Sequence, residues 1–130
     1  MSIQRMSRAV MPGMTNHRRI LFGGMLMQWM DELSGIAAKR FDGGEVATVA
    51  VKEIRFLKPV PQGAFLDVTA QVIAQGNTSI TVLVTAWMDK NGSDEQQEKA
   101  AEGEFVYVAL DEQGNPRKAG IRNENRSSSN

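Results

Sequence analysis

The spacing of apolar residues along this chain becomes helical near Phe22 and stays so for about five turns. Apolar side chains then recur at i, i+4, i+7, i+11 and i+15, at Leu26, Met30, Leu33, Ala37 and Phe41. Trp29 and Ile36 flank this stripe. The pattern predicts one helix of roughly 19 residues, from Phe22 or Gly23 to about Phe41, with a length of about 28 Å. The sequence Asp42-Gly43-Gly44 is typical of a helix end.

The other segments have the composition and alternation of β-strands. Residues 3–11 predict a first strand, which Pro12-Gly13 ends, and residues 14–21 predict a loop. Four more strands are predicted after the helix, at residues 45–57, 65–75, 78–89 and 100–110. Two of them alternate clearly, with one face made of Leu66, Val68, Ala70, Val72 and Ala74, and of Ile80, Val82, Val84, Ala86 and Met88. Short turns between the last four strands favour antiparallel pairing.

The predicted order is therefore β-α-β-β-β-β, in the α+β class. A helix with so wide an apolar stripe is best buried against one face of the antiparallel sheet. An antiparallel sheet wrapped around one long central helix is the hotdog fold. We expect a single domain over residues 1–118 and a disordered polar tail over residues 119–130.

Composition excludes several classes of protein. Fifteen basic residues balance fifteen acidic ones, which argues against nucleic-acid binding through phosphate neutralisation. The chain has no cysteine and one histidine, so we expect no disulfide, no metal site and no cysteine nucleophile. We also expect no other cofactor. No apolar run approaches the roughly 18 residues of a membrane span, and residues 1–13 lack an apolar signal core. A cytoplasmic location is the expectation.

Residues 16–35 carry the most suggestive chemistry. Gly23 and Gly24 stand where the loop becomes the helix, and Asp31 follows two turns later. The N–H groups at a helix start suit an anion or a polarised carbonyl oxygen, and glycine lets a ligand approach the backbone. A carboxylate further along the helix could then direct water at that carbonyl. Two simpler interpretations stay open: one is that the glycines only make the helix start flexible, and the other is that Asp31 is a solvated acid beside Glu32.

A second stripe on the predicted helix consists of small or polar residues: Gly24, Gln28, Asp31, Gly35 and Ala38. A ligand or a second chain could approach closely there, so we expect at least a homodimer. We expect Trp29, Met25, Met27 and Phe56 in the core. His17 is the only histidine, but no serine or cysteine nucleophile motif accompanies it, and we do not assign it as the general base.

Several short motifs occur here in the order and spacing of a known family. They are Asn16, Phe22-Gly23-Gly24, Met30-Asp31, Phe56-Leu57-Lys58-Pro59-Val60, Gly76-Asn77-Thr78-Ser79, Phe105-Val106-Tyr107-Val108-Ala109 and Gly114-Asn115-Pro116-Arg117. On these motifs the chain resembles, over residues 8–118, the hotdog-fold acyl-CoA thioesterases of the YciA type and the related cytosolic acyl-CoA hydrolases. One departure concerns Arg19, where the family commonly has a glycine.

The resemblance implies an acyl-CoA thioester hydrolase. It implies that Asp31 acts as general base or as nucleophile, that Asn16 orients the water or the thioester, and that the N–H of Gly24 or its neighbour Gly23 polarises the carbonyl. Thr78 and Ser79 would line the groove for pantetheine and nucleotide. Because coenzyme A carries phosphates, Lys58, Arg117 and Lys118 are candidates to bind them. The site would lie between two protomers, with Asn16 of one near Asp31 of the other, in dimers that assemble into hexamers or tetramers.

Two other functions stay open on the same fold. One is a non-catalytic protein that binds or senses acyl-CoA. The other is a hydratase or dehydratase, which typically uses an acid–histidine pair, whereas His17 lies in the predicted loop.

Overall fold

The structure of the protein is a computed structural model that describes residues 3–90 and 96–122. It contains β1 (Gln4–Ala9), a short 3-10 helix η1 (Pro12–Met14), α1 (Gly23–Asp42), β2 (Glu45–Phe56), β3 (Phe65–Gln75), β4 (Ser79–Asp89) and β5 (Glu98–Leu110). The predicted order β-α-β-β-β-β is confirmed. No helix in the described part of the chain is long and apolar enough to cross a membrane.

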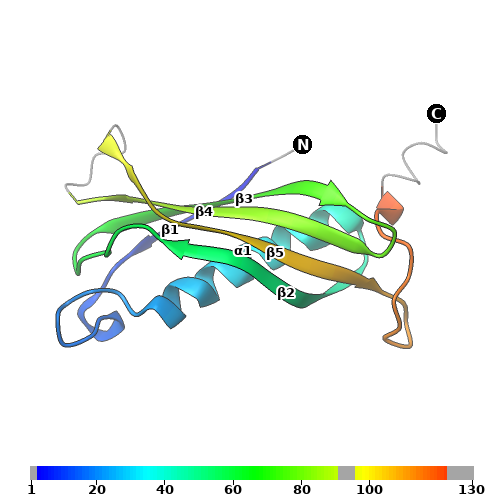
Figure 1. The fold of residues 1–130 in the computed structure, drawn as a ribbon, viewed down its shortest axis with the longest axis horizontal. Helices are drawn as coiled ribbons and strands as arrows, with labels where there is room; N and C mark the ends of the chain where they lie inside the picture. The colour runs from blue at the N-terminus through cyan, green and yellow to red at the C-terminus, as the bar shows by residue number, and fades with distance from the viewer. Residues whose placement is uncertain (1–2, 91–95, 123–130) are drawn as a thin grey trace.

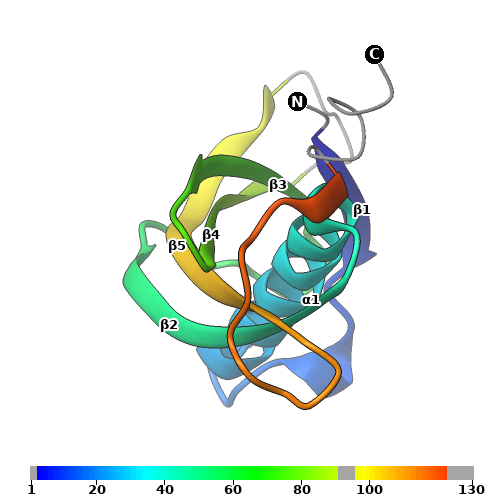
Figure 2. The ribbon, with the colours of Figure 1, turned by 90° about the vertical axis from the view of Figure 1, so that its right-hand side faces the viewer.

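The strands form one antiparallel sheet in the order β1-β3-β4-β5-β2, so that β1 and β2 are its edges. The helix α1 runs along the sheet, and the view along the long axis shows the sheet curling around it (Figures 1 and 2). The hotdog fold is thereby confirmed. A left-handed Gly43 follows α1, and its N–H donates to the carbonyl of Lys39.

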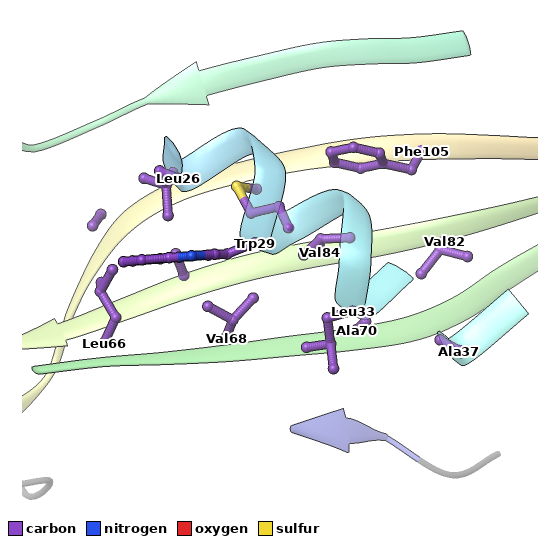
Figure 3. Close-up of a cluster of buried hydrophobic side chains, with 14 of the residues drawn as sticks. Leu26, Trp29, Leu33, Ala37, Leu66, Val68, Ala70, Val82, Val84 and Phe105 are labelled. Carbon is purple, nitrogen blue, oxygen red and sulfur yellow. The ribbon is translucent and has the colours of Figure 1, made fainter. Parts of the chain in front are cut away.

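The core lies between α1 and the concave face of the sheet. Leu26, Trp29, Met30 and Leu33 are buried on the helix, as the apolar stripe predicts. They meet the inward-facing side chains of β3, β4 and β5, among them Leu66, Val68, Ala70, Val82, Val84 and Phe105 (Figure 3). Burying a large aliphatic or aromatic side chain stabilises a fold by about 1.5–3 kcal/mol, so this helix–sheet contact is the main source of stability.

Three predicted core positions are wrong. Ala74 is exposed because the pairing of β3 with β4 shifts register between Val72 and Ala74, which turns the following residues outward. Met27 lies on the outer side of α1 with 36% of its surface exposed. Phe56, at the end of β2, is 52% exposed.

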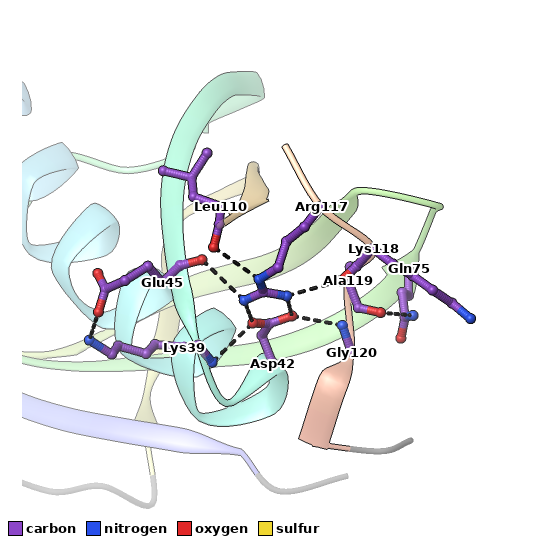
Figure 4. A network of polar contacts seen from close by, with 10 residues as sticks. Lys39, Asp42, Glu45, Gln75, Leu110, Arg117, Lys118, Ala119 and Gly120 are labelled. Atoms are coloured by element: carbon purple, nitrogen blue, oxygen red, sulfur yellow. Dashed lines mark hydrogen bonds and ion pairs between the residues drawn. The ribbon is translucent and has the colours of Figure 1, made fainter. Parts of the chain in front are cut away.

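The C-terminal segment is tied to the end of α1 by the carboxylate of Asp42 (Figure 4). This residue is fully buried and accepts hydrogen bonds from Arg117, from Gly120 N at 2.7 Å and from Gly44 N at 3.0 Å. Burial alone would raise the pKa of Asp42, but these hydrogen bonds, led by Arg117, together lower it below its ordinary value of 3.8.

The domain boundary at residue 118 therefore needs correction. Ala119 and Gly120 are buried, and Ala119 N donates to Asn77 O at 2.8 Å while its carbonyl accepts from Gln75 Nε2 at 2.9 Å. The packed chain continues to these residues because their backbone groups bond to the β3–β4 turn and to Asp42. Residues 123–130 of the expected tail lie outside the described residues.

Arg19 has the left-handed conformation, with φ 59°. Its N–H donates to Asn16 O and its carbonyl accepts from Gln62 N, both at 2.9 Å, so the loop pairing imposes this conformation. A side chain in this region costs roughly 1–2 kcal/mol, whereas glycine adopts it freely. We expect Arg19→Gly to raise the free energy of unfolding by up to about 1 kcal/mol, because glycine also gains entropy in the unfolded chain.

Urea unfolding with Arg18→Gly as the matched control tests this prediction. Arg18 is the neighbouring exposed arginine and has no positive φ. Its replacement by glycine should give no gain in stability. Equal effects of the two substitutions would contradict strain at Arg19.

Candidate active site

Asp31 lies in the third turn of α1 with an exposed side chain. Its Oδ1 accepts two hydroxyl hydrogen bonds, from Tyr107 Oη at 2.9 Å and from Thr48 Oγ1 at 3.1 Å. Its Oδ2 has no hydrogen-bond partner within residues 3–90 and 96–122. One oxygen of the carboxylate is thus held by the fold, and the other is open to a ligand or to water.

Tyr107 enters this cluster from β5. Its side chain is buried, and its Oη also lies 3.0 Å from Asp31 O and 2.5 Å from Ser34 Oγ. Ser34 is fully buried on α1, one turn after Asp31, and its Oγ also lies 3.0 Å from Asp31 O. Burial raises the pKa of Tyr107 to about 12, and the negative charge of Asp31 acts in the same direction. The phenol is therefore a neutral hydrogen-bond donor near pH 7.

Sequence reasoning gave no role to Tyr107, Thr48 or Ser34. A signal for Tyr107 was present, because the alternation of β5 puts it on the same face as Phe105 and Ala109, which are buried. A hydroxyl on an otherwise apolar helix-facing row must find a partner on the helix. Thr48 and Ser34 carry no comparable signal.

Gly23 and Gly24 form the first turn of α1, as predicted, and both are exposed. The preceding Phe22 provides no side-chain cap. The N–H groups of Gly23 and Gly24 have no acceptor in the described part of the chain. Asp31 follows seven residues after Gly24, which is about 10 Å along the helix axis. The neighbouring acid Glu32 is bonded to Gln28 at 3.2 Å and to Arg8 of β1 at 3.5 Å.

Asn16 shapes the loop before the helix. Its Oδ1 accepts from Arg18 N at 2.9 Å and from Ile20 N at 3.2 Å, and its backbone N–H donates to Ile20 O at 2.9 Å. Among the described residues of this one chain, Asn16 makes no hydrogen bond to Asp31.

The predicted substrate-binding residues fall at two ends of the molecule (Figure 1). Lys58 follows β2 near the start of α1, where its Nζ lies 3.5 Å from Glu98 Oε2 with half of the side chain exposed. Thr78 lies in the β3–β4 turn and Ser79 is the first residue of β4, near the opposite end of the helix, where Thr78 O accepts from Ala109 N at 2.9 Å. A single chain therefore does not gather these residues into one groove.

Arg117 is also at that second end, and its geometry does not support the expected phosphate contact. Its guanidinium donates to both oxygens of the buried Asp42. The other N–H groups reach Leu110 O and Lys118 O at 2.9 Å and Glu45 O at 3.4 Å. All five donors of an arginine side chain are thus used inside the protein. Within this chain the guanidinium of Arg117 holds Asp42, and its role in phosphate binding stays a prediction without support from this geometry.

A family model and a curated relative both relate this chain to thioesterases. A model of the thioesterase superfamily matches residues 19–94. The acyl-CoA thioester hydrolase YciA of Salmonella typhimurium is 40% identical over 109 residues, which are 82% of each chain.

Two solved structures cover nearly the whole chain. The acyl-CoA hydrolase of Staphylococcus aureus, in complex with butyryl coenzyme A and coenzyme A, is 30% identical with a TM-score of 0.83, over 98% of this chain and 85% of that one. The hexameric thioesterase y2039 of Yersinia pestis is 38% identical with a TM-score of 0.79, over 88% of this chain and 92% of that one. Structures of the S. aureus hydrolase also exist with one aspartate, one threonine or one asparagine changed to alanine.

Proposed function

This chain belongs to the thioesterase superfamily as an acyl-CoA thioester hydrolase, and we propose that Asp31 drives the attack of water on the thioester carbonyl. The observation that carries the proposal is the carboxylate of Asp31, with Oδ1 fixed by two hydroxyls and Oδ2 open. It stands two turns from an uncapped helix start whose N–H groups can receive a developing oxyanion.

In the proposed reaction, Oδ2 of Asp31 takes a proton from water as the water oxygen bonds to the carbonyl carbon. The N–H of Gly24, or of Gly23, stabilises the oxyanion of the tetrahedral intermediate. Collapse of that intermediate breaks the carbon–sulfur bond, and the proton held by Asp31 passes to the leaving thiolate of coenzyme A. A route in which Asp31 attacks as nucleophile and forms an anhydride fits the same residues.

The S. aureus variants support the choice of residues. The intervals along that chain between its changed asparagine, aspartate and threonine equal those from Asn16 to Asp31 and from Asp31 to Thr48 here. Thr48 Oγ1 also donates to Asp31 Oδ1. We therefore assign Asn16, Asp31 and Thr48 to one catalytic site, in which the side-chain amide of Asn16 orients the water or the thioester.

We propose that this site is shared between two protomers, joined through their β2 edges with their α1 helices side by side and antiparallel. An unpaired edge strand is a ready template for another strand, and β2 carries the exposed side chains of Val49 and Val51. In this arrangement the start of one helix, with Gly24 and Lys58, lies near the end of the other, with Thr78 and Ser79. The hexameric relative from Y. pestis supports an assembly of this kind.

Sedimentation tests this assembly. We expect a dimer or a multiple of it at micromolar concentration, not a 14.3 kDa monomer. Val51→Lys should dissociate the dimer because it puts a charge on the proposed β2 edge. Ile73→Lys is the matched control, since Ile73 is similarly exposed on β3. A monomeric wild-type protein, or dissociation by Ile73→Lys alone, would contradict the β2 interface.

Gly24→Ala separates a functional glycine from a merely flexible one. Among the described residues, a methyl group at this position would meet no atom within 4 Å outside its chain neighbours and its own helix backbone, so the fold should tolerate it or gain up to about 1 kcal/mol in stability. If the thioester carbonyl approaches this N–H closely, the same methyl group should misplace it and lower kcat/KM by about tenfold or more. Thermal melting together with steady-state hydrolysis measures both effects. Unchanged kcat/KM would remove Gly24 from the site.

Release of free thiol from a series of acyl-CoAs tests the proposed function. Hydrolysis that depends on Asp31 would support it. Tight binding of acyl-CoA without thiol release would favour a sensor. Hydration of an enoyl-CoA without thiol release would favour a hydratase. The same series would identify the preferred acyl length.

A further inference from the structure

We propose that Tyr107 is a positioning residue for hydrolysis, which fixes Oδ1 of Asp31 and thereby leaves Oδ2 as the oxygen that takes the proton from water. The inference rests on the proposed role of Asp31. It concerns a side chain in β5 that lies 76 positions from Asp31 in the sequence and is buried beneath α1.

The hydroxyl protons of this cluster can be placed by counting donors. Ser34 has one proton, which goes either to Asp31 O at 3.0 Å or to Tyr107 Oη at 2.5 Å. The 2.5 Å contact between the two hydroxyl oxygens needs a proton between them. When Ser34 supplies that proton, the single proton of Tyr107 is available for the Asp31 carboxylate at 2.9 Å. An ionised carboxylate is a stronger acceptor than a serine hydroxyl or a backbone carbonyl, so the favoured arrangement has Ser34 donating to Tyr107 and the phenol donating to Oδ1.

The hydrogen-bond accepting capacity of Asp31 Oδ1 is then filled. A carboxylate oxygen accepts two hydrogen bonds in its own plane, and Oδ1 receives those of Tyr107 and Thr48. Its protonation would displace one of these donors. Protonation of Oδ2 displaces none, because Oδ2 has no partner among the described residues. The buried ring of Tyr107 also limits rotation of the carboxylate, since rotation would break the bond to Oδ1.

The groups around this carboxylate can be named within the described part of the chain. From β5 it faces the phenol of Tyr107, and from β2 the hydroxyl of Thr48. On its own helix the neighbour is Glu32, whose carboxylate is engaged by Arg8 of β1 and by Gln28. A change at Tyr107 should therefore act on catalysis mainly through Asp31.

Tyr107→Phe removes the donor and keeps the ring. We expect kcat to fall by about tenfold with KM nearly unchanged. The acid limb of the pH–rate profile should move to higher pH, because a hydrogen bond to the carboxylate favours its ionised form. A side chain that only packs would change neither the limb nor the ratio of kcat to KM.

Fluorotyrosine gives a second test with the opposite sign. Tyr107 is the only tyrosine in the chain, so replacing all tyrosine by 3-fluorotyrosine labels this residue alone. The more acidic phenol donates a stronger hydrogen bond, and the acid limb should move to lower pH. The fluorine NMR shift should also follow the ionisation of Asp31, and Asp31→Asn in the labelled protein should abolish that step. This test does not depend on the folding of Tyr107→Phe.

Thr85→Val is the matched control. Thr85 is a buried hydroxyl that donates to Glu102 Oε2 at 3.0 Å, between β4 and β5 but away from Asp31. It should leave the pH–rate profile in place. An unmoved acid limb in both Tyr107 variants, without a fluorine titration step, would overturn the proposal. A fluorine step that depends on Asp31 but does not coincide with the acid limb would instead refute Asp31 as the base and keep its bond to Tyr107.

Discussion

Asp31→Asn is expected to lower kcat for acyl-CoA hydrolysis about a hundredfold or more, the range found for positioned acid–base groups. Asparagine keeps the shape of the side chain and a carbonyl oxygen that can still accept from Tyr107 and Thr48. The fold should therefore change little in stability, and coenzyme A should bind as before. Steady-state hydrolysis, urea unfolding and calorimetric binding of coenzyme A measure the three quantities.

Glu32→Gln is the control for this experiment. Glu32 follows Asp31 on α1, and its exposed carboxylate pairs with Arg8 and accepts from Gln28. Exposed ion pairs contribute at most about 1 kcal/mol, so both activity and stability should remain close to wild type. Full activity of Asp31→Asn, or loss of activity in Glu32→Gln, would show that the base is assigned to the wrong residue.

Arg117→Met should have the largest effect on stability, a loss of about 3–5 kcal/mol in the free energy of unfolding. The substitution leaves the carboxylate of Asp42 fully buried without its ion-pair partner. The hydrogen bonds from Gly44 and Gly120 remain, and cannot replace a positive charge. Urea unfolding at pH 7 measures the loss. The KM for acyl-CoA should stay unchanged while the variant is folded, because the guanidinium is already engaged by the protein.

The loss should depend on pH. The pKa of Asp42 in the folded protein lies below its ordinary value of 3.8. Its ionised form therefore contributes its full stability above about pH 3.8, and this contribution is lost as the pH falls through the pKa of the folded state. In Arg117→Met the buried carboxyl is more easily protonated. The difference between wild type and variant should therefore shrink below about pH 4.

Lys39→Met is the matched control for the buried ion pair. Lys39 Nζ lies 2.7 Å from Glu45 Oε1 in the same region, but the two side chains are 57% and 72% exposed. Its loss should cost less than about 1 kcal/mol at any pH in this range. Equal effects of Lys39→Met and Arg117→Met would contradict the special role of burial. A raised KM in Arg117→Met would support a phosphate-binding role for Arg117.

The elements and the class of fold could be predicted from the sequence alone. The spacing of Leu26, Met30 and Leu33 encodes a helix with one apolar face, and alternation encodes strands with one face turned inward. Both periodicities are local properties of the backbone, so they can be read without knowing what the elements contact. Asp31, Gly23 and Gly24 could be singled out for the same reason, because their places on the helix follow from its start.

Which side chains come into contact depends on how these elements pack in three dimensions. The pairing of β2 with β5, and of both with α1, brings Thr48 and Tyr107 to Asp31 across 17 and 76 positions. The approach of the C-terminal segment to the end of α1 engages Arg117 with Asp42 across 75 positions. The register shift after Val72 turns Ala74 outward. These contacts depend on strand order, register and packing. Hydrophobic periodicity leaves them open, because the alternation within one strand does not identify its partner strand or the register of their pairing.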